Sequence, residues 1–235
     1  MIVRCDQELF VLFPEASVHG VVFEGVADFD PAVATLWKQK AIESLSARDI
    51  TSETILESPA VREWRDAFQR FGVKPSKYRS AIEALLRRAL KQEIIETDLP
   101  LVNLYCYVSL IEMVPMGAYD LETVEGDIVI RLSKANETFV GIGDDNPLIS
   151  KPGMVVYSDD GGIICWAWNH RDAARTALSR KTNKAIFFAD SASQESTSRA
   201  DSAISLLADA LSATGAIEVR RFMLNQAAGS VDIDF

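Results

Sequence analysis

The apolar stretch from Leu101 to Met113 carries a few polar side chains of types that can form a small binding pocket. Asn103 and Tyr107 lie four residues apart, so on a helix they share one face, and Ser109 follows them. An amide and a hydroxyl placed together can recognise an amide, hydroxyl or carboxyl group of a substrate. They can equally satisfy backbone groups of the fold, as buried polar side chains must. The sequence leaves both interpretations open.

A second set of candidate side chains follows this stretch. Asp120 can act on a substrate, or it can cap a short helical turn that ends at Gly126, and capping is the simpler interpretation. Trp166 and Trp168 alternate on one face of an expected strand, where aromatic side chains usually belong to the core. Beside Arg171 they would also form a wall on which a base or a ribose stacks.

Several motifs of nucleotide and metal chemistry are absent from the sequence. The chain has no G-x-x-x-x-G-K-[ST] phosphate loop, and Gly141-Ile-Gly143 lacks the third glycine of a dinucleotide site. No C-x-x-C or H-x-x-x-H pair gives metal-ligand spacing. We therefore expect neither a metal nor another cofactor. Only His19 and His170 could serve as a histidine base, and nothing in the sequence points to a nucleophile beside either.

Composition narrows the class of protein. The 235-residue chain is 48% hydrophobic, which is enough for a packed core. No apolar run reaches the ~20 residues of a membrane span, and the first residues lack a secretory signal pattern. The cysteines Cys5, Cys106 and Cys165 are far apart, which favours free thiols in a reducing compartment. We therefore predict a cytoplasmic protein.

The charge of the chain is acidic overall and locally basic. A net charge of −10 argues against a general polyanion binder, because nucleic-acid affinity depends largely on phosphate neutralisation. Residues 60–91 nevertheless hold nine cationic and three acidic side chains, and residues 169–184 hold five and one. These segments are either solvated helix faces or a local surface for one RNA end. In the second case the RNA-binding side chains are Lys77, Arg79, Arg87, Arg88, Lys91, Arg175, Arg180 and Lys181.

Local signals predict the elements of the first half. Residues 9–26, rich in β-branched and aromatic side chains, predict two strands about a turn. Asp30-Pro31 and Ser58-Pro59 each place a capping side chain before proline at the first helical position, so helices should begin at both. Ser76 is expected to cap a third helix. The segment 102–113 is apolar nearly all round and predicts a buried helix.

Strand patterns dominate after Gly126. Strands are expected over residues 127–133, 137–142, 154–157, 163–168, 185–189 and 217–224. The sequence Asp159-Asp-Gly-Gly162 predicts a hairpin. Residues 191–198 should form a polar linker, residues around 204–211 a helix and residues 225–235 a loosely held tail.

The stretch Leu101–Ile130 resembles the B3/B4 domain of the phenylalanyl-tRNA synthetase beta chain. That domain has the pattern V-D-x-T-N-Y-V-M-L-x-x-G-x-P-x-H-A-F-D-L, followed by G-x-I-x-V-R. The matching positions here are Val102, Tyr107, Val108, Leu110, Pro115, Ala118, Asp120, Leu121, Gly126, Ile128, Ile130 and Arg131. The likeness continues more weakly to about Asp190.

The resemblance implies a mixed α/β fold in which central β-sheet layers are packed by helices. It implies one stand-alone domain over residues 1–235, in three parts. These are a helical N-terminal portion (1–98), the segment that best matches the synthetase (99–190), and a closing helix and strand (191–235).

In the synthetase this domain proofreads by hydrolysing the ester between a wrong amino acid and tRNA. The resemblance therefore implies recognition of the aminoacylated 3′ end of tRNA with hydrolysis of a mischarged ester in trans. It implies neither a full tRNA ligase nor a DNA or membrane partner. A non-catalytic module that binds RNA or a small ligand is the alternative, and a small-molecule esterase or amidase is a third reading. The sequence leaves open whether the chain forms a homodimer.

Site roles follow from the resemblance position by position. It assigns catalysis to Asn103, Tyr107 and Asp120, and substrate binding to Cys106, Gly117, Trp168, Asn169 and Arg171. Three positions depart from the family pattern: Asn103 replaces an aspartate, Cys106 an asparagine and Gly117 a histidine. A later glutamate of the family has no equivalent here. These departures favour an aminoacyl ester other than the one that the synthetase edits.

Overall fold

The computed structural model describes residues 1–234 as helices stacked on β-sheets. A six-stranded sheet has the order β12-β1-β4-β7-β8-β9, a four-stranded sheet the order β11-β2-β10-β3, and β5 pairs with β6. The strands are β1 (Ile2–Cys5), β2 (Ser17–Glu24), β3 (Met116–Asp120), β4 (Ile128–Leu132), β5 (Thr138–Phe139), β6 (Leu148–Ile149), β7 (Val155–Asp159), β8 (Gly162–Trp166), β9 (Arg171–Asp172), β10 (Lys184–Ser191), β11 (Ile217–Leu224) and β12 (Ser230–Asp232). The helices are α1 (Gln7–Leu12), α2 (Pro31–Ser46), α3 (Pro59–Arg70), α4 (Ala81–Ala89), α5 (Pro100–Glu112) and α6 (Gln194–Ser212).

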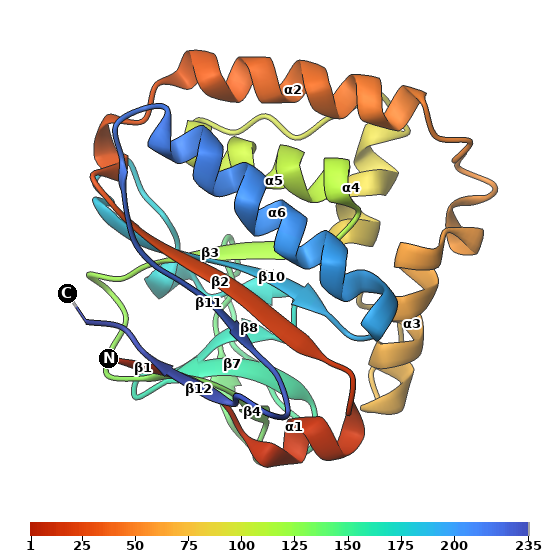
Figure 1. The fold of residues 1–235 in the computed structure, drawn as a ribbon. Coiled ribbons are helices and arrows are strands. Elements are labelled where there is room, and N and C mark those ends of the chain that lie inside the picture. Colours follow the sequence, from red (N-terminus) through yellow and green to blue (C-terminus); the bar gives the residue numbers. More distant parts are fainter. Residues whose placement is uncertain (235) are drawn as a thin grey trace.

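The four-stranded sheet forms the middle layer. Figure 1 shows α2, α5 and α6 on one side of β2, β10 and β3, and the strands β4, β7 and β8 on the other side. Both faces of the central strands are therefore covered, and every residue of β10 after Lys184 is buried. This burial explains the unbroken apolar run Ala185–Ala189, since a strand covered on both faces need not alternate.

Helices begin as predicted where a strong capping signal is present. Asp30 accepts a hydrogen bond from the backbone N–H of Ala32 at 2.9 Å, and α2 begins at Pro31. α3 begins at Pro59 as predicted, although the Ser58 hydroxyl makes no capping hydrogen bond among the described residues. The predicted buried helix is α5, which packs against α2, α6 and β3. The predicted hairpin is also confirmed, because β7 and β8 pair next to their turn at Asp159 and Gly162.

The sequence pattern misassigns two segments in the first half. Residues 7–12 form α1 rather than a strand, with Leu9 in the core and Val11 79% exposed. Apolar side chains at adjacent positions fit either element, and a short segment gives periodicity too little length to decide. α4 begins after Ser80 rather than after Ser76. The Ser80 hydroxyl accepts a hydrogen bond from a backbone N–H of the first turn at 3.4 Å, so it is the side chain that caps the helix.

α6 begins at Gln194 and replaces most of the polar linker predicted over residues 191–198. Ser196 anchors its first turn, because the buried hydroxyl bonds Ser191 Oγ at 2.7 Å and the carboxylate of Glu63. Serine-rich composition predicts a loop, and these tertiary hydrogen bonds override that preference. Within residues 1–234, none of the helices has the length and apolar character needed to cross a lipid bilayer.

The C-terminal segment is held in the fold, so the prediction of a loose tail is wrong. β12 pairs antiparallel with β1, with Val231 opposite Val3. Ile233 is fully buried, and its N–H donates to the carbonyl of Met1 at 2.8 Å. Apolar burial and strand pairing therefore fix this segment up to Ile233. Phe235, the last residue of the predicted tail, lies outside the described residues.

Candidate functional site

A small cavity of about 60 Å³ opens where β3, β8, β9 and β10 meet the start of α4. Two carboxyl groups line it, those of Asp172 and Asp190. The phenol-bearing side chains of Tyr119 and Tyr157 and the amide-bearing side chain of Asn169 line it as well. Two acids, two phenols and an amide therefore surround one small space in the interior.

Asp190 is the more deeply buried acid, with 5% of its surface exposed. Its carboxylate accepts a short hydrogen bond from the Tyr157 hydroxyl and a longer one from Asn169 Nδ2 at 3.4 Å. Burial penalises the charged form and raises the pKa of Asp190 to about 7, although these hydrogen bonds oppose the rise. The carboxyl group therefore exchanges its proton near neutral pH, which suits a general acid or base.

Asp172 also lines the cavity, at the end of β9. Its Oδ1 accepts a hydrogen bond from the Tyr119 hydroxyl at 3.2 Å. Desolvation raises the pKa of Asp172 to about 6, against the hydrogen bonds from Cys165 and Tyr119. A Cβ atom at Gly117 would lie 3.8 Å from both carboxylate oxygens, so the glycine leaves this face of the acid open.

The raised pKa of Asp190 makes the free energy of unfolding depend on pH. Between pH 3.8 and about pH 7 the native state keeps a proton that the unfolded chain has lost, so stability falls as pH rises through this window. Below pH 3.8 the carboxyl group is protonated in both states, so it no longer lowers the free energy of unfolding. We expect Asp190→Asn to raise the melting temperature relative to the parent protein more at pH 8 than at pH 4. Thermal melts at both values test this, and an equal difference at the two would contradict it.

Other polar atoms at the cavity lack partners within the structure. Asn169 Oδ1 and Trp168 Nε1 are buried and make no hydrogen bond of standard geometry among residues 1–234. The Trp168 indole N–H still lies near enough to Asp190 to favour its charged form. Buried polar atoms are nearly always paired in folded proteins, by protein, ligand or water. An unpaired acceptor beside two acids marks a place that a bound group can complete.

The turn that carries this edge of the cavity has an uncommon backbone. Ala167 and Trp168 have φ angles of 54° and 64°, in the left-handed region that side chains other than glycine rarely adopt. Packing holds the turn in place, because the Trp168 ring meets the rings of Trp64 and Phe13 edge to face, at 5.0 and 4.8 Å. Strain of this kind persists only where surrounding structure fixes it, and it is common at functional sites.

The residues of the cavity fall within a known protein domain. The model of the B3/4 domain family matches residues 63–215, which include every residue of the cavity. The chain belongs to the B3/4 domain family. The resemblance read from the sequence is confirmed. No curated protein matches the chain.

One of the solved structures that are similar to this B3/4 domain protein comes from a tRNA synthetase. It is an N-terminal fragment of the phenylalanyl-tRNA synthetase beta-subunit from Pyrococcus horikoshii, with 10% sequence identity and a TM-score of 0.49. The match covers 94% of this chain and 53% of that one, so the chain spans about half the length of the fragment.

The mouth of the cavity joins it to α4 of the B3/4 domain. Arg171 lies here, 44% exposed and paired with Asp144. His170 Nδ1 donates to the backbone carbonyl of Arg79 at 2.7 Å, and the N–H of Ala81 donates to the carbonyl of Asn169 at 2.9 Å. Burial lowers the pKa of His170, so its ring is neutral with the proton on Nδ1. The start of α4 is thereby fixed to the cavity.

Asn103 and Tyr107 do not line this cavity. Asn103 Oδ1 accepts from the backbone N–H of Thr97 at 2.8 Å, and Asn103 Nδ2 donates to the Thr97 carbonyl at 3.0 Å. The Tyr107 hydroxyl donates to the Ile95 carbonyl at 2.8 Å. Both side chains thus satisfy the loop before α5, which is the structural interpretation of the two that the sequence left open.

Replacing Asn103 with alanine is therefore expected to lower the free energy of unfolding by about 1–3 kcal/mol, because the Thr97 backbone groups are left unpaired. Asn146→Ala, in the exposed loop after β5, is the matched control and should change stability little. Chemical denaturation of the three proteins gives the comparison. A variant as stable as the parent would contradict the structural role of Asn103.

Three further predicted site residues have different surroundings. Asp120 is absent from the cavity wall, because its carboxylate accepts from Thr182 Oγ1 at 2.5 Å and from the N–H of Glu122 at 3.0 Å. It ends β3 and caps the following turn. Cys106 is buried, and desolvation raises the pKa of its thiol to about 12, which leaves it a poor nucleophile. Gly117 does line the cavity, as described above.

The two tryptophans belong to the core. Trp168 reaches the cavity, but it is fully buried among aromatic rings. Trp166 packs against Tyr78 and His170, with ring centroids 4.7 and 5.6 Å away, and is 4% exposed. Neither ring offers a free face, so the alternative of an aromatic wall that stacks a base is wrong for both.

The predicted RNA-binding cations separate into two groups. Arg79, Arg87, Arg88 and Lys91 line one cavity on α4. The others are dispersed: Arg175 is paired with the buried Asp159, Arg180 lies 3.5 Å from Asp98, Lys77 lies over the Tyr78 ring and Lys181 is exposed. The basic segment 60–91 therefore contains a local site, whereas the cations of residues 169–184 do not gather at one place.

The acids of the cavity were not among the predicted site residues. Asp172 belongs to the basic segment 169–184, and Asp190 follows the apolar run Ala185–Ala189. An acid inside a buried strand is a signal that sequence reading can use, since such a group must be paired or functional. Nothing local in the sequence indicates that the two acids meet.

Proposed function

We propose that this B3/4 domain binds the aminoacylated 3′ end of tRNA and hydrolyses the ester of a wrong amino acid. The observation that carries the proposal is the pair of acids, Asp172 and Asp190, with raised pKa values in one cavity. Membership of the B3/4 family and the likeness of residues 101–131 to a proofreading domain support tRNA as the partner. Enzymes use such environments to tune acids for proton transfer at neutral pH.

The two acids suit different parts of an aminoacyl ester. The carboxylate of Asp172 is uncovered on the side that faces Gly117, so it would bind the ammonium group of the aminoacyl ester. Asp190 would accept a proton from the attacking water and return it to the ribose oxygen when the acyl–oxygen bond breaks. Water and ester then give an amino acid and a free ribose hydroxyl, with no other reactant. The Tyr157 hydroxyl and Asn169 Nδ2 donate hydrogen bonds to Asp190, and the Trp168 N–H also favours its charged form. A cavity of about 60 Å³ favours a small aminoacyl group.

A non-catalytic binding module is the second candidate, and one observation favours it. Asn103, Tyr107 and Asp120, which the resemblance assigns to catalysis, are all bonded to the protein's own loops. A domain in which these three side chains stabilise the fold would bind its ligand without cleaving it.

Turnover of a panel of mischarged tRNAs by the purified protein separates the two candidates. Release of the amino acid from one member, with no change in the uncharged tRNA, supports hydrolysis. Binding of the same tRNAs without loss of ester at any protein concentration supports the binding module. The panel should begin with glycyl, alanyl and seryl esters, because the cavity is small.

A further inference from the structure

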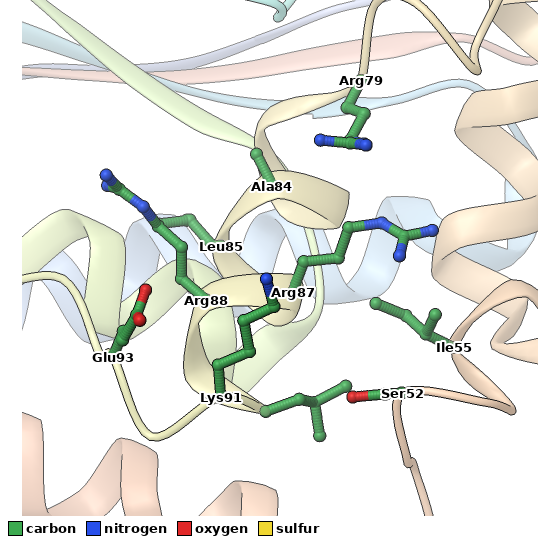
Figure 2. A pocket seen from close by; sticks show the side chains of 10 residues that line it. Ser52, Ile55, Arg79, Ala84, Leu85, Arg87, Arg88, Lys91 and Glu93 are labelled. Atoms are coloured by element: carbon green, nitrogen blue, oxygen red, sulfur yellow. The ribbon is translucent and has the colours of Figure 1, made fainter.

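A second and larger cavity, of about 400 Å³, lies between the segment around Ser52–Ile55 and α4. Figure 2 shows its lining side chains, with Arg87 and Arg88 leaving α4 in opposite directions and Arg79 beyond its start. Its charged residues are four cations, Arg79, Arg87, Arg88 and Lys91, and one acid, Glu93. The cavity is therefore strongly electropositive in a chain whose net charge is −10.

A buried carboxylate orients two of these arginines. Glu83 has 0% exposure and accepts hydrogen bonds from Arg65 at 3.0 and 3.1 Å and from Arg87 at 2.9 Å. Arg79 Nε lies 3.9 Å from the same carboxylate. Three guanidinium groups thus surround one negative charge, which leaves excess positive charge fixed in place. An arginine held in this way loses little side-chain freedom when it binds an anion.

The other two cations have no acid of their own. Among residues 1–234, neither Arg88 nor Lys91 is within ion-pair distance of a carboxylate. Apolar side chains also line the cavity, namely those of Ile55, Leu85 and Leu90. Cations can bind a phosphate, and apolar side chains beside them can contact a base or a ribose. This combination suits one nucleotide better than a purely ionic ligand.

The first residues of α4 connect this cavity to the acid cavity. Arg79 lines the basic cavity and accepts a hydrogen bond from His170 of the acid cavity at 2.7 Å. Ala81 lines the acid cavity and Ala84 the basic one. We infer that the basic cavity binds a phosphate-bearing nucleotide of RNA and so anchors the backbone of the strand whose end enters the acid cavity. This inference rests on the proposed function for the identity of that strand.

Calorimetric titration with the trinucleotide CCA, with cytidine 5′-monophosphate and with pyrophosphate tests the inference directly, without any ester. The variant is Arg88→Gln with Lys91→Gln, which leaves the Glu83 cluster intact. It should bind CCA about 10- to 100-fold more weakly, because charge-assisted hydrogen bonds are lost. The slope of log affinity against log salt should become shallower by about 0.7, as expected for one phosphate contact on a single strand. Arg220→Gln, an exposed arginine of β11, is the matched control and should bind as the parent does.

Each outcome decides the inference, and a thermal melt confirms that the variants are folded. Unchanged binding of CCA by the double variant overturns the inference. Binding of pyrophosphate or the mononucleotide but not of CCA assigns a free phosphate ligand and overturns the RNA assignment. Cavity-dependent binding of CCA by a protein that hydrolyses no mischarged tRNA supports the inference and overturns the proposed hydrolysis, so the two failures are distinguishable.

Discussion

Replacing Asp190 with asparagine is expected to lower the rate of ester hydrolysis by a factor of about 10²–10⁴, the usual contribution of general acid–base catalysis. The amide keeps the size of the side chain but cannot take a proton from water. Single-turnover deacylation of a mischarged tRNA measures the effect. In the parent protein the rate should rise with pH as Asp190 loses its proton near pH 7, because the carboxylate is the active base. The variant should lack this rise.

Asp49→Asn is the control for this change, since Asp49 is exposed and does not line the acid cavity. Its rate should match that of the parent. A variant at Asp190 that keeps the parent rate and pH profile would leave the acid pair with a structural role, and the binding module would then be the better description. Asp172→Asn should act mainly on KM, because Asp172 is assigned to the ammonium group.

Replacing Trp168 with alanine is expected to lower the free energy of unfolding by about 3–5 kcal/mol, the range for a large aromatic side chain removed from a core. Trp168 is fully buried against Trp64, Phe13 and Phe71. The change also removes the packing that holds two residues at positive φ. Urea denaturation gives the comparison, with Leu36→Ala as control because Leu36 is 56% exposed. A loss below about 1 kcal/mol, the scale of ordinary surface changes, would argue against the core role of Trp168.

Several elements could be predicted because their signals are local. Asp30-Pro31 and Ser58-Pro59 begin α2 and α3, and the glycine-containing turn after Asp159 joins β7 to β8. The start of α6 was missed because the hydrogen bonds of Ser196 connect it to Glu63, far away in the chain. Helix caps and turns depend on residues that are neighbours in the sequence, whereas tertiary hydrogen bonds join residues that are far apart in it.

The candidate site was harder to predict for a related reason. Helical spacing correctly indicates that Asn103 and Tyr107 share a face, but it cannot tell what covers that face, and the loop around Ile95 does. The acid pair depends on the pairing of β10 with β3 and of β8 with β9, which places Asp190 and Asp172 around one space. Register between strands is set by the whole core, so a single sequence does not show that Asp172 and Asp190 line the same cavity.

The placement of β1 between β12 and β4 affects how the chain can fold during synthesis. β1 contains residues 2–5, and its antiparallel partner contains residues 230–232. At about 5–20 residues per second, the ribosome makes that partner roughly 10–50 s after β1 leaves it. Through this interval β1 offers open hydrogen-bonding groups, with apolar Val3 in its middle, to any passing strand. The pairing of β1 with β12 can therefore form only after residues 230–232 are made, and a holding chaperone that covers β1 would protect this open edge in the meantime.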